Sequence, residues 1–468
     1  MVESAIAGRV SVAPQVFAPG HLGELTQIID TVLVDAVAQE TGTTQKRVRL
    51  LPTRVVVFFV LGLALFEDCG YWLVWGKLTA SLGSVVRPSV SALCRARRRV
   101  GPAPLQALFE AVAGVVAAPS VPGVCWRGLR LVAWDATCLR APDAAAVRRV
   151  LRRRGGSKVV WGYPLLRLSV LVECGTRALI GAAFGADTVG ENGYARRLLP
   201  CLRPDMLLLA DAYYDDRVLL AQVDATGAAW LVRSTAARTL LIGTVLPDGS
   251  YLSRLVGRRR GDRHVEVRVI EAWLTMRCAD DTVRRARWRL LTSLTDHHRF
   301  PAADLVRLYH DRWEAETCFR GIKSTVLDGR VLRSRFPADI EQEVWALLTV
   351  YQSLIRVGVD AVTGPAAPAG IDPDRVSLTV AWQSARDQVV AACGIHPPAP
   401  GPHHDAIGTA VRAALLPPRR QRLKARTKKI ATSQYKAAGT SWPKTSLTYT
   451  IDTEIAIFEE GLTARSKP

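Results

Sequence analysis

Five polar side chains recur at helical spacing between residues 309 and 323. They are Tyr309, Arg312, Glu316, Arg320 and Lys323, and offsets of three, four and seven residues return to nearly the same side of an α-helix. One carboxylate among three cations suits a surface that holds a metal ion with its acid and a polyphosphate backbone with its bases. The alternative is a merely solvated helix, because a Glu–Arg pair four residues apart is a common helix-stabilising pair.

Two aspartates are candidates for the same chemistry. Asp135 follows the apolar run 129–134, and Asp211 follows the continuous apolar run 206–210, which is typical of a central buried strand. Adjacent strands would bring the two aspartates side by side, and a helix packed across the sheet would place Glu316 opposite them. Hard divalent cations prefer oxygen ligands, and a pair of them can activate an attacking oxygen and stabilise a leaving one in phosphodiester chemistry.

Each aspartate also has a purely structural interpretation. Either one alone is better accounted for as a cap or turn residue after a strand, and Asp215 and Asp216 are alternative ligands. The histidine pairs 297–298 and 403–404 are isolated in loop-like contexts, so no cluster favours a softer metal. The sequence has neither a Walker-type glycine loop nor a Gly-x-Ser-x-Gly elbow. The three acids therefore become persuasive only together.

The charge of the chain points to a polyanionic partner. The 468 residues are 49% hydrophobic, which is enough for a large core and two to four domains, and the formal net charge is +20. Nucleic acid is the first partner to expect for so basic a protein.

The cysteines and the apolar runs bear on the compartment. Nine cysteines are scattered without a Cys-x-x-Cys pair, as in a reducing environment, and no secretory signal opens the chain. The most apolar run, 55–65, is too short to span a bilayer. We expect a cytoplasmic, nucleoid-associated protein with no membrane partner.

The residues from about 20 to 110 are predicted to be mostly helical. The run 55–66 predicts a helix that is apolar on nearly all sides, and Ser89 is the expected cap of a further helix. That helix carries Arg95, Arg97, Arg98 and Arg99, which either contact DNA phosphates or form a solvated basic face.

Strands dominate the middle of the chain. The order predicted is strand 129–134, strands 165–173 and 177–184, helix 192–200 and strand 206–210, with acids at two strand ends. A second β-rich stretch covers 229–294, with strands at 230–232, 240–245, 265–270 and 288–294. The helix that carries Glu316 follows, with Asp304 as its expected cap, and then a helix over 340–355.

The last hundred residues contain less regular structure. The segment 363–368 is expected to be a linker, and 377–392 a helix. Residues 417–444 contain nine lysines and arginines and no acid, which predicts a mobile arm that neutralises phosphates.

These residues together resemble the motifs of a known family. Tyr309, Arg312, Glu316 and Lys323 match, with every spacing intact, the Tyr-Arg-Glu-Lys signature of DDE transposases of the insertion-sequence-four family. Asp135-Ala136-Thr137 resembles the first-aspartate motif, with Ala136 in place of the usual glycine, and 210–214 resembles the second, without the arginine that often follows the aspartate. The segments 17–23 and 51–54 resemble the N-terminal domain of one branch of that family.

The resemblance implies a fold class and an organisation. The fold class is α/β: an RNase H-like catalytic core with a β-rich insertion, preceded by a helical N-terminal domain and followed by a helical, basic C-terminal region. The expected domains are a DNA-binding domain at 1–118, a catalytic domain at 124–356 with its insertion at about 229–295, and a C-terminal region at 357–468.

The resemblance also implies an activity. It implies cut-and-paste transposition by nicking, hairpin formation at the element's end and strand transfer. By that likeness Asp135, Asp211 and Glu316 bind two Mg ions, which Mn can replace, while Tyr309, Arg312 and Lys323 hold phosphates near the cleaved end. Arg320, on the same side of the helix, is a further candidate for a DNA contact. The implied partner is double-stranded DNA, both inverted-repeat ends and target, bound by a homodimer. A nuclease of the same fold without strand transfer, and a non-catalytic DNA-binding transposition inhibitor, are the alternatives.

Overall fold

The computed structural model describes residues 21–45, 50–80, 87–153, 162–235, 238–255, 264–277, 283–365, 367–391, 405–418 and 452–457. Two compact units can be distinguished, and both are discontinuous in sequence. Unit 1 contains Met1–Ala113, Gly321–Ala361 and Ser377–Ala414, and unit 2 contains Gly114–Arg320, Val362–Val376 and Leu415–Pro468. The basic stretch 417–444 falls almost wholly outside the described residues.

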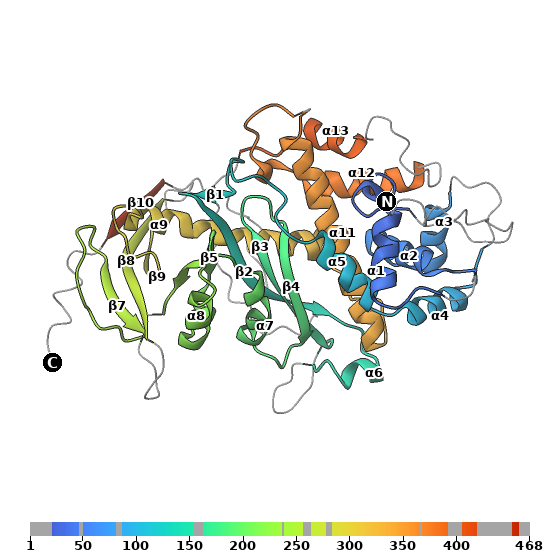
Figure 1. Cartoon of the computed structure of the whole chain (residues 1–468), viewed down its shortest axis with the longest axis horizontal. Helices are drawn as coiled ribbons and strands as arrows, with labels where there is room; N and C mark the ends of the chain where they lie inside the picture. Colours follow the sequence, from blue (N-terminus) through green and yellow to red (C-terminus); the bar gives the residue numbers. More distant parts are fainter. Residues whose placement is uncertain are drawn as a thin grey trace, which may run out of the picture. The chain divides into compact units, whose positions relative to one another are not determined.

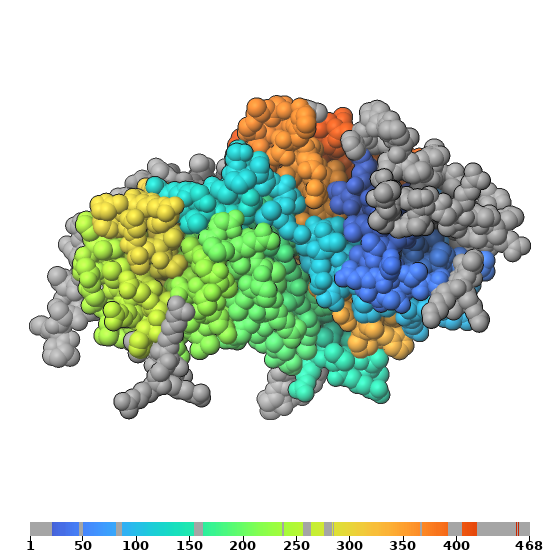
Figure 2. All heavy atoms as spheres, in the orientation of Figure 1, coloured from blue at the N-terminus to red at the C-terminus, as the bar shows by residue number. Residues whose placement is uncertain are grey.

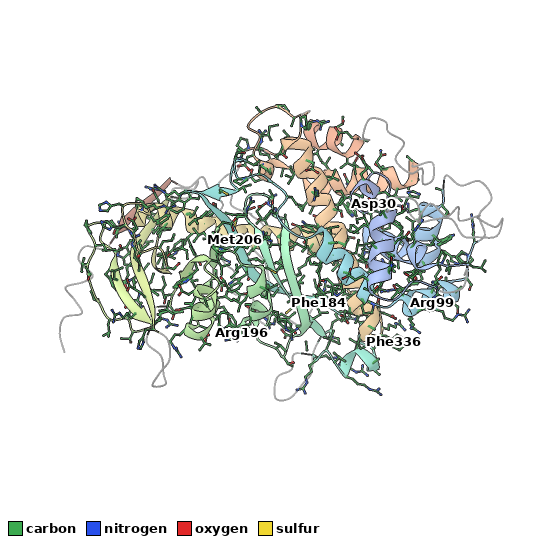
Figure 3. The ribbon with its side chains drawn as sticks, viewed as in Figure 1. Asp30, Arg99, Phe184, Arg196, Met206 and Phe336 are labelled. Atoms are coloured by element: carbon green, nitrogen blue, oxygen red, sulfur yellow. The ribbon has the colours of Figure 1, made fainter. Side chains whose placement is uncertain are left out.

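Unit 1 is built from helices around an apolar centre (Figure 1). Every residue of the helix that begins at Thr53 is buried except Arg54, which explains why its sequence is apolar on nearly all sides. Asp30, labelled in Figure 3, caps the first helix by accepting a hydrogen bond from the Leu33 N–H at 2.7 Å. The helices are α1 (Thr31–Glu40), α2 (Thr53–Leu65), α3 (Tyr71–Leu78), α4 (Val90–Val100), α5 (Ala103–Val112), most of α11 (Pro337–Thr363), α12 (Leu378–Ala391) and α13 (Ala406–Ala413).

Helix α4 confirms the predicted cap but corrects one prediction about its arginines. Ser89 accepts a hydrogen bond from the Ala92 N–H at 3.1 Å. Arg97, a candidate for DNA contact, is instead only 3% exposed and donates to the Tyr71 hydroxyl, the Ser334 hydroxyl and a backbone carbonyl of α11. Its side chain joins segments that lie more than 230 residues apart in sequence, a contact that spacing along α4 could not reveal.

Unit 2 is organised around one mixed sheet. Its core strands are β2 (Leu129–Arg140), β3 (Leu165–Glu173), β4 (Leu179–Ala186), β5 (Met206–Ala210) and β6 (Ala229–Arg233). They lie in the order β4-β3-β2-β5-β6, with β2–β3 and β3–β4 antiparallel and β2–β5 and β5–β6 parallel. This order and these directions are those of an RNase H-like core.

Helices cover both faces of this sheet. On one face α7 (Glu191–Leu198) and α8 (Arg217–Asp224) share a core with β2 and β5 that includes Trp134, Leu208 and Tyr214, and these helices lie in the green surface of Figure 2. On the other face α10 (Trp313–Arg320) contacts β2 and β3. Successive side chains of a strand point to opposite faces, so residues 134 and 135 of β2 face different helices.

A further set of strands extends the sheet beyond β6 (Figure 1). These are β7 (Tyr251–Leu255), β8 (Val265–Arg277), β9 (Val283–Thr292) and β10 (Asp452–Ile457), and the short β1 (Cys125–Trp126) pairs with β2. Strand β9 pairs antiparallel with β6 and β8, while β7 and β10 pair with successive halves of β8.

Several predicted boundaries need correction. The predicted strand 240–245 is wrong, because only Val245 forms an isolated bridge, to Tyr251. The helix before Glu316 begins at Ala302 as α9 (Ala302–Leu308), so Asp304 lies in its first turn and is not its cap. Asp135 lies within β2 and not at its end, because β2 continues to Arg140 alongside β3.

Two absences hold within the described part of the chain. No helix there is long and apolar enough to cross a bilayer. No disulfide bond joins any of the cysteines in that part of the chain.

Candidate active site

Asp135 and Asp211 lie side by side because their strands run parallel. The last paired residues of β2 and β5 are Ala133 and Leu209, and each aspartate follows two residues further on. Asp211 then caps a short 3-10 turn (Ala212–Tyr214) by accepting from the Tyr213 N–H at 2.9 Å. The interpretation of Asp211 as a cap is therefore correct and is compatible with a site beside Asp135.

Asp135 and Glu316 are joined by one arginine. Alternation along β2 turns Asp135 away from the face where Trp134 is buried with α7 and α8, and toward α10. Arg312 Nη1 lies 3.8 Å from Asp135 Oδ2, and Arg312 Nη2 donates to Glu316 Oε1 at 3.1 Å. The Glu316 side chain is 35% exposed to solvent, and the Asp135 side chain is 15% exposed. Glu316 is therefore the more accessible of the two acids.

The electrostatics link the three predicted acids. Burial raises the pKa of Asp135 to about 7, against the lowering effect of Arg312, and the charges of Asp211 and Glu316 raise that pKa further. The hydroxyl of Tyr214 also has a pKa well above its usual value, first because of burial and then because of the charge of Asp135. The three carboxylates thus lie within electrostatic range of one another, although their positions in the sequence are far apart.

The helical segment that carries Glu316 is continuous but changes its winding. After α9 come a 3-10 turn (Tyr309–Arg312), α10 and then a π turn (Gly321–Val326). The sequence predicted one uniform α-helix with all five side chains along one side. Because the winding changes, the five side chains instead lie in different environments. Tyr309 and Arg312 are buried, Arg320 is exposed, and Lys323 lies in the π turn that belongs to unit 1.

Tyr309 is fixed to the strand that leads to Asp211. Its hydroxyl donates to the Ala210 carbonyl at 3.0 Å, and its ring packs edge-on against Trp288 with centroids 5.3 Å apart. Burial raises the pKa of this hydroxyl well above its usual range. Tyr309 therefore contributes to the position of Asp211 through the backbone.

The three acids offer only oxygen donors to a divalent cation. In the part of the chain that the structure describes, no three His, Cys, Asp or Glu side chains are grouped closely enough to hold a metal ion as they stand. The Arg312 guanidinium instead interacts with two of the three acids. The donor atoms still fit a hard cation, since all are carboxylate oxygens and burial disfavours the anionic form of Asp135 even with Arg312 beside it.

The structure gives the alternative acids structural roles. Asp215 accepts hydrogen bonds from the Ser234 hydroxyl at 2.7 Å and from Arg238 Nε at 2.9 Å. Asp216 caps α8 by accepting from the Leu219 N–H. Both side chains are thus used to hold local structure.

One contact at the site had no signal in the sequence. Arg177, in the turn between β3 and β4, has a positive φ of 65° and donates from Nε to Glu314 of α10 at 2.7 Å. Its Nη2 donates to the Asp374 carbonyl at 3.1 Å. This arginine holds the helix of Glu316 against the sheet. A single sequence does not distinguish such an arginine, with its positive φ, from any other arginine in a turn.

Comparison with known proteins identifies the family. Residues 19–110 match the family described as insertion element 4 transposase N-terminal, and residues 126–352 match the transposase DDE domain. The chain is a DDE transposase of the insertion-sequence-four family. Its catalytic activity is that of a transposase, and divalent metal ions are typical of the family.

Two known transposases show how similar this chain is to characterised proteins in sequence and in structure. The transposase is 29% identical over 348 residues to transposase InsG for insertion sequence element IS4 of Escherichia coli (strain K12), which covers 72% of this chain and 76% of InsG. A cryo-EM structure of the piggyBac transposase synaptic complex with hairpin DNA has a TM-score of 0.40 at 9% identity and covers 83% of this chain and 84% of that one.

Proposed function

We propose that this transposase catalyses metal-dependent cut-and-paste transposition of its own insertion sequence, by end cleavage followed by strand transfer. The observation that carries the proposal is the meeting of Asp135, Arg312 and Glu316 beside the strand end that bears Asp211. Phosphodiester chemistry needs carboxylates for metal ions and cations for the phosphate, and both kinds of group meet here.

In this proposal Asp135, Asp211 and Glu316 are the catalytic residues and hold two Mg ions, for which Mn can substitute. Bound ions would supply Lewis-acid stabilisation of the attacking and leaving oxygens. Asp135 must release its proton to serve as a ligand, and its raised pKa makes that release part of metal binding.

The DNA contacts proposed are Tyr309, Arg312, Arg320 and Lys323. Arg312 Nε and Nη1 are buried and have no hydrogen-bond partner among the described residues, which supports a role in binding a phosphate oxygen. The exposed Arg320 offers a second cation to the backbone. A contact between Tyr309 and a phosphate would require its hydrogen bond to the Ala210 carbonyl to open.

The wider organisation proposed follows from the same activity. The partners are the double-stranded inverted-repeat ends and target DNA, bound by a homodimer in the cytoplasm at the nucleoid. Residues 1–118 form the DNA-binding domain, 124–356 the catalytic domain with its insertion at about 229–295, and 357–468 the C-terminal region.

The test is substitution of each acid in the full chain. We expect Asp135→Asn, Asp211→Asn and Glu316→Gln to reduce Mg-dependent cleavage of the element's end DNA by at least about a thousandfold, because each removes an oxygen ligand. Salt-sensitive DNA binding should stay within about twofold of the parent. Asp216→Asn is the matched control, because it removes a nearby carboxylate that caps α8. Normal cleavage by any one of the three variants would refute its assignment.

A strand-transfer assay separates transposition from its alternatives. End DNA with a free 3′-hydroxyl should become joined to a plasmid in the presence of Mg. Cleavage without joining would indicate a nuclease of the same fold. DNA binding with neither reaction, unchanged by the three substitutions, would indicate a transposition inhibitor.

A further inference from the structure

The outer half of the β8–β9 pair has an unusual surface. On one face of β8, Val267 and Val269 are fully buried in the core shared with α8. Further along the same face, Trp273 is 40% exposed. Since side chains alternate along a strand, residues 267, 269, 271 and 273 all point to the same face of the sheet. This face is therefore buried at residues 267 and 269 and exposed to solvent at residue 273.

Arginines of β9 surround this tryptophan. Arg287 pairs directly opposite Trp273, and Arg285 lies opposite Thr275. Cross-strand partners point to the same face, so Trp273, Arg285 and Arg287 form one exposed group, which we call the arginine face. Residues two apart on a strand are separated by roughly 6.8 Å, so the two guanidinium groups form a short row.

The charge of the arginine face is only partly neutralised by the neighbouring acid. Glu271 forms an ion pair with Arg287 and also accepts from Arg289 Nε at 2.8 Å. One carboxylate therefore serves two arginines, while the Arg287 side chain stays 42% exposed. Arg285 is exposed as well, so the exposed indole of Trp273 lies among exposed guanidinium groups.

We propose that the arginine face binds the backbone of duplex DNA outside the catalytic site. This inference rests on the proposed function, which supplies DNA as the partner. Guanidinium groups bind phosphate oxygens through paired N–H donors, and they suit this role better than lysine. The indole of Trp273 packs against the deoxyribose between two phosphates, where it contributes apolar contact area and no charge.

The experiment measures the salt dependence of affinity for a 40-base-pair duplex of random sequence. Each lost phosphate contact lowers the slope of log K against log salt by about one. The double variant Arg285→Ala/Arg287→Ala should therefore bind several-fold more weakly at about 0.1 M salt, with a slope lower by about two. Trp273→Ala should weaken binding with an unchanged slope, because the indole is uncharged.

A matched control lies on the same sheet. Arg254 of β7 is exposed but pairs opposite Glu266, on the other face of β8. Arg254→Ala changes the net charge by one unit without touching the arginine face, so its slope should stay that of the parent. Arg285→Gln repeats the test without disturbing the Glu271 ion pair, and Tm measurements verify that each variant is folded.

Each outcome decides the proposal. A slope lower by about two for the double variant, or by about one for Arg285→Gln, with an unchanged slope for Arg254→Ala, supports it. Equal slopes for all variants overturn it, while the cleavage assays with Asp135→Asn still stand as a separate test of the proposed function. Absence of salt-dependent binding by the parent chain would overturn both.

Discussion

Asp135 is a carboxylate in a buried environment that disfavours its charged form. It lies in a buried strand, near Asp211 and Glu316, and its nearest compensating charge is Arg312 at 3.8 Å. Burial raises its pKa to about 7, so at neutral pH a large fraction of molecules keep the proton. Protons and divalent cations therefore compete for this side chain.

Metal affinity should rise with pH through this pKa. The folded pKa lies above the ordinary value of 3.8, so the stability contributed by the protonated carboxyl is present at low pH and is lost as pH rises through 7. A bound cation stabilises the deprotonated carboxylate instead, and we expect Mn affinity, measured by calorimetry, to increase about fivefold between pH 6 and 7 and to level off above about pH 8. Asp135→Asn should bind more weakly and with a flatter profile. Equal affinity at pH 6 and 8 in the parent would contradict competition between protons and metal at Asp135.

The Tyr309 hydroxyl should matter for the geometry of Asp211. Tyr309→Phe removes the hydrogen bond to the Ala210 carbonyl and leaves that buried carbonyl with one partner fewer. The expected loss in unfolding free energy is about 1 kcal/mol, together with weaker Mn binding. Tyr213→Phe is the control, since Tyr213 is exposed on the following turn. An unchanged Mn affinity in Tyr309→Phe would show that the bond has no influence on the site.

The sequence identified the residues of the site better than it identified the contacts that these residues make. The two aspartates could be found because each follows an apolar run, and Glu316 because of its neighbours. The ion pair between Arg312 and Asp135 could not be found, because it joins a strand to a 3-10 turn far away in the sequence. A prediction from residue spacing assumes one constant helical period, whereas this segment contains 3-10, α and π winding in succession.

At the level of elements, the position of α10 depends on a contact outside the family signature. Arg177 donates to Glu314 with little exposure of either side chain, so the pair is well shielded from solvent. Removal of one partner leaves the other charged and buried, which typically costs about 3 to 5 kcal/mol.

We therefore expect Arg177→Ala to destabilise unit 2 by an amount in that range and to lower the cleavage rate by more than it weakens DNA binding. The double variant Arg177→Ala/Glu314→Gln should recover part of the stability, because no lone charge remains. Arg148→Ala, which breaks an exposed pair with Asp143, is the control and should change stability little. Denaturant unfolding of the parent, Arg177→Ala, Glu314→Gln and the double variant tests the pair, and full additivity of the two single changes would argue against it.

Strongly patterned elements were predicted well. Strands β3 and β5 and helices α2, α4 and α12 lie within two residues of their expected positions, because apolar periodicity and caps fix them locally. The predicted strand 240–245 failed because its side chains are largely exposed and it forms only one bridge. A short apolar run carries no information about whether a partner strand is available.

At the scale of the whole molecule, unit 1 is assembled from three separate stretches of chain. Gly321, the first residue of the second stretch, lies so close to Leu378 of the third that an added Cβ would come within 2.7 Å of it. Apolar periodicity along the chain cannot predict such an assembly, because it marks helices and not their partners.

Arg97 provides the test of this assembly. Arg97→Leu removes the donors that Ser334 and the Asp339 carbonyl now use, and should lower the urea midpoint of unit 1 by an amount equivalent to about 3 kcal/mol or more. Arg95→Ala, on the exposed side of the same helix, should cost under about 0.5 kcal/mol. Similar midpoints for the two variants would mean that these bonds are dispensable.

Strand β10 has a practical consequence for anyone who shortens this polypeptide. Residues 452–457 supply the neighbour for positions 272–277 of β8, and a truncated version ending before them would leave those backbone amides and carbonyls open to another molecule. Open strand margins recruit strands from other chains and promote aggregation. Poor solubility of such a fragment would then reflect an unprotected sheet border, and restoring the missing strand would be the first remedy to try.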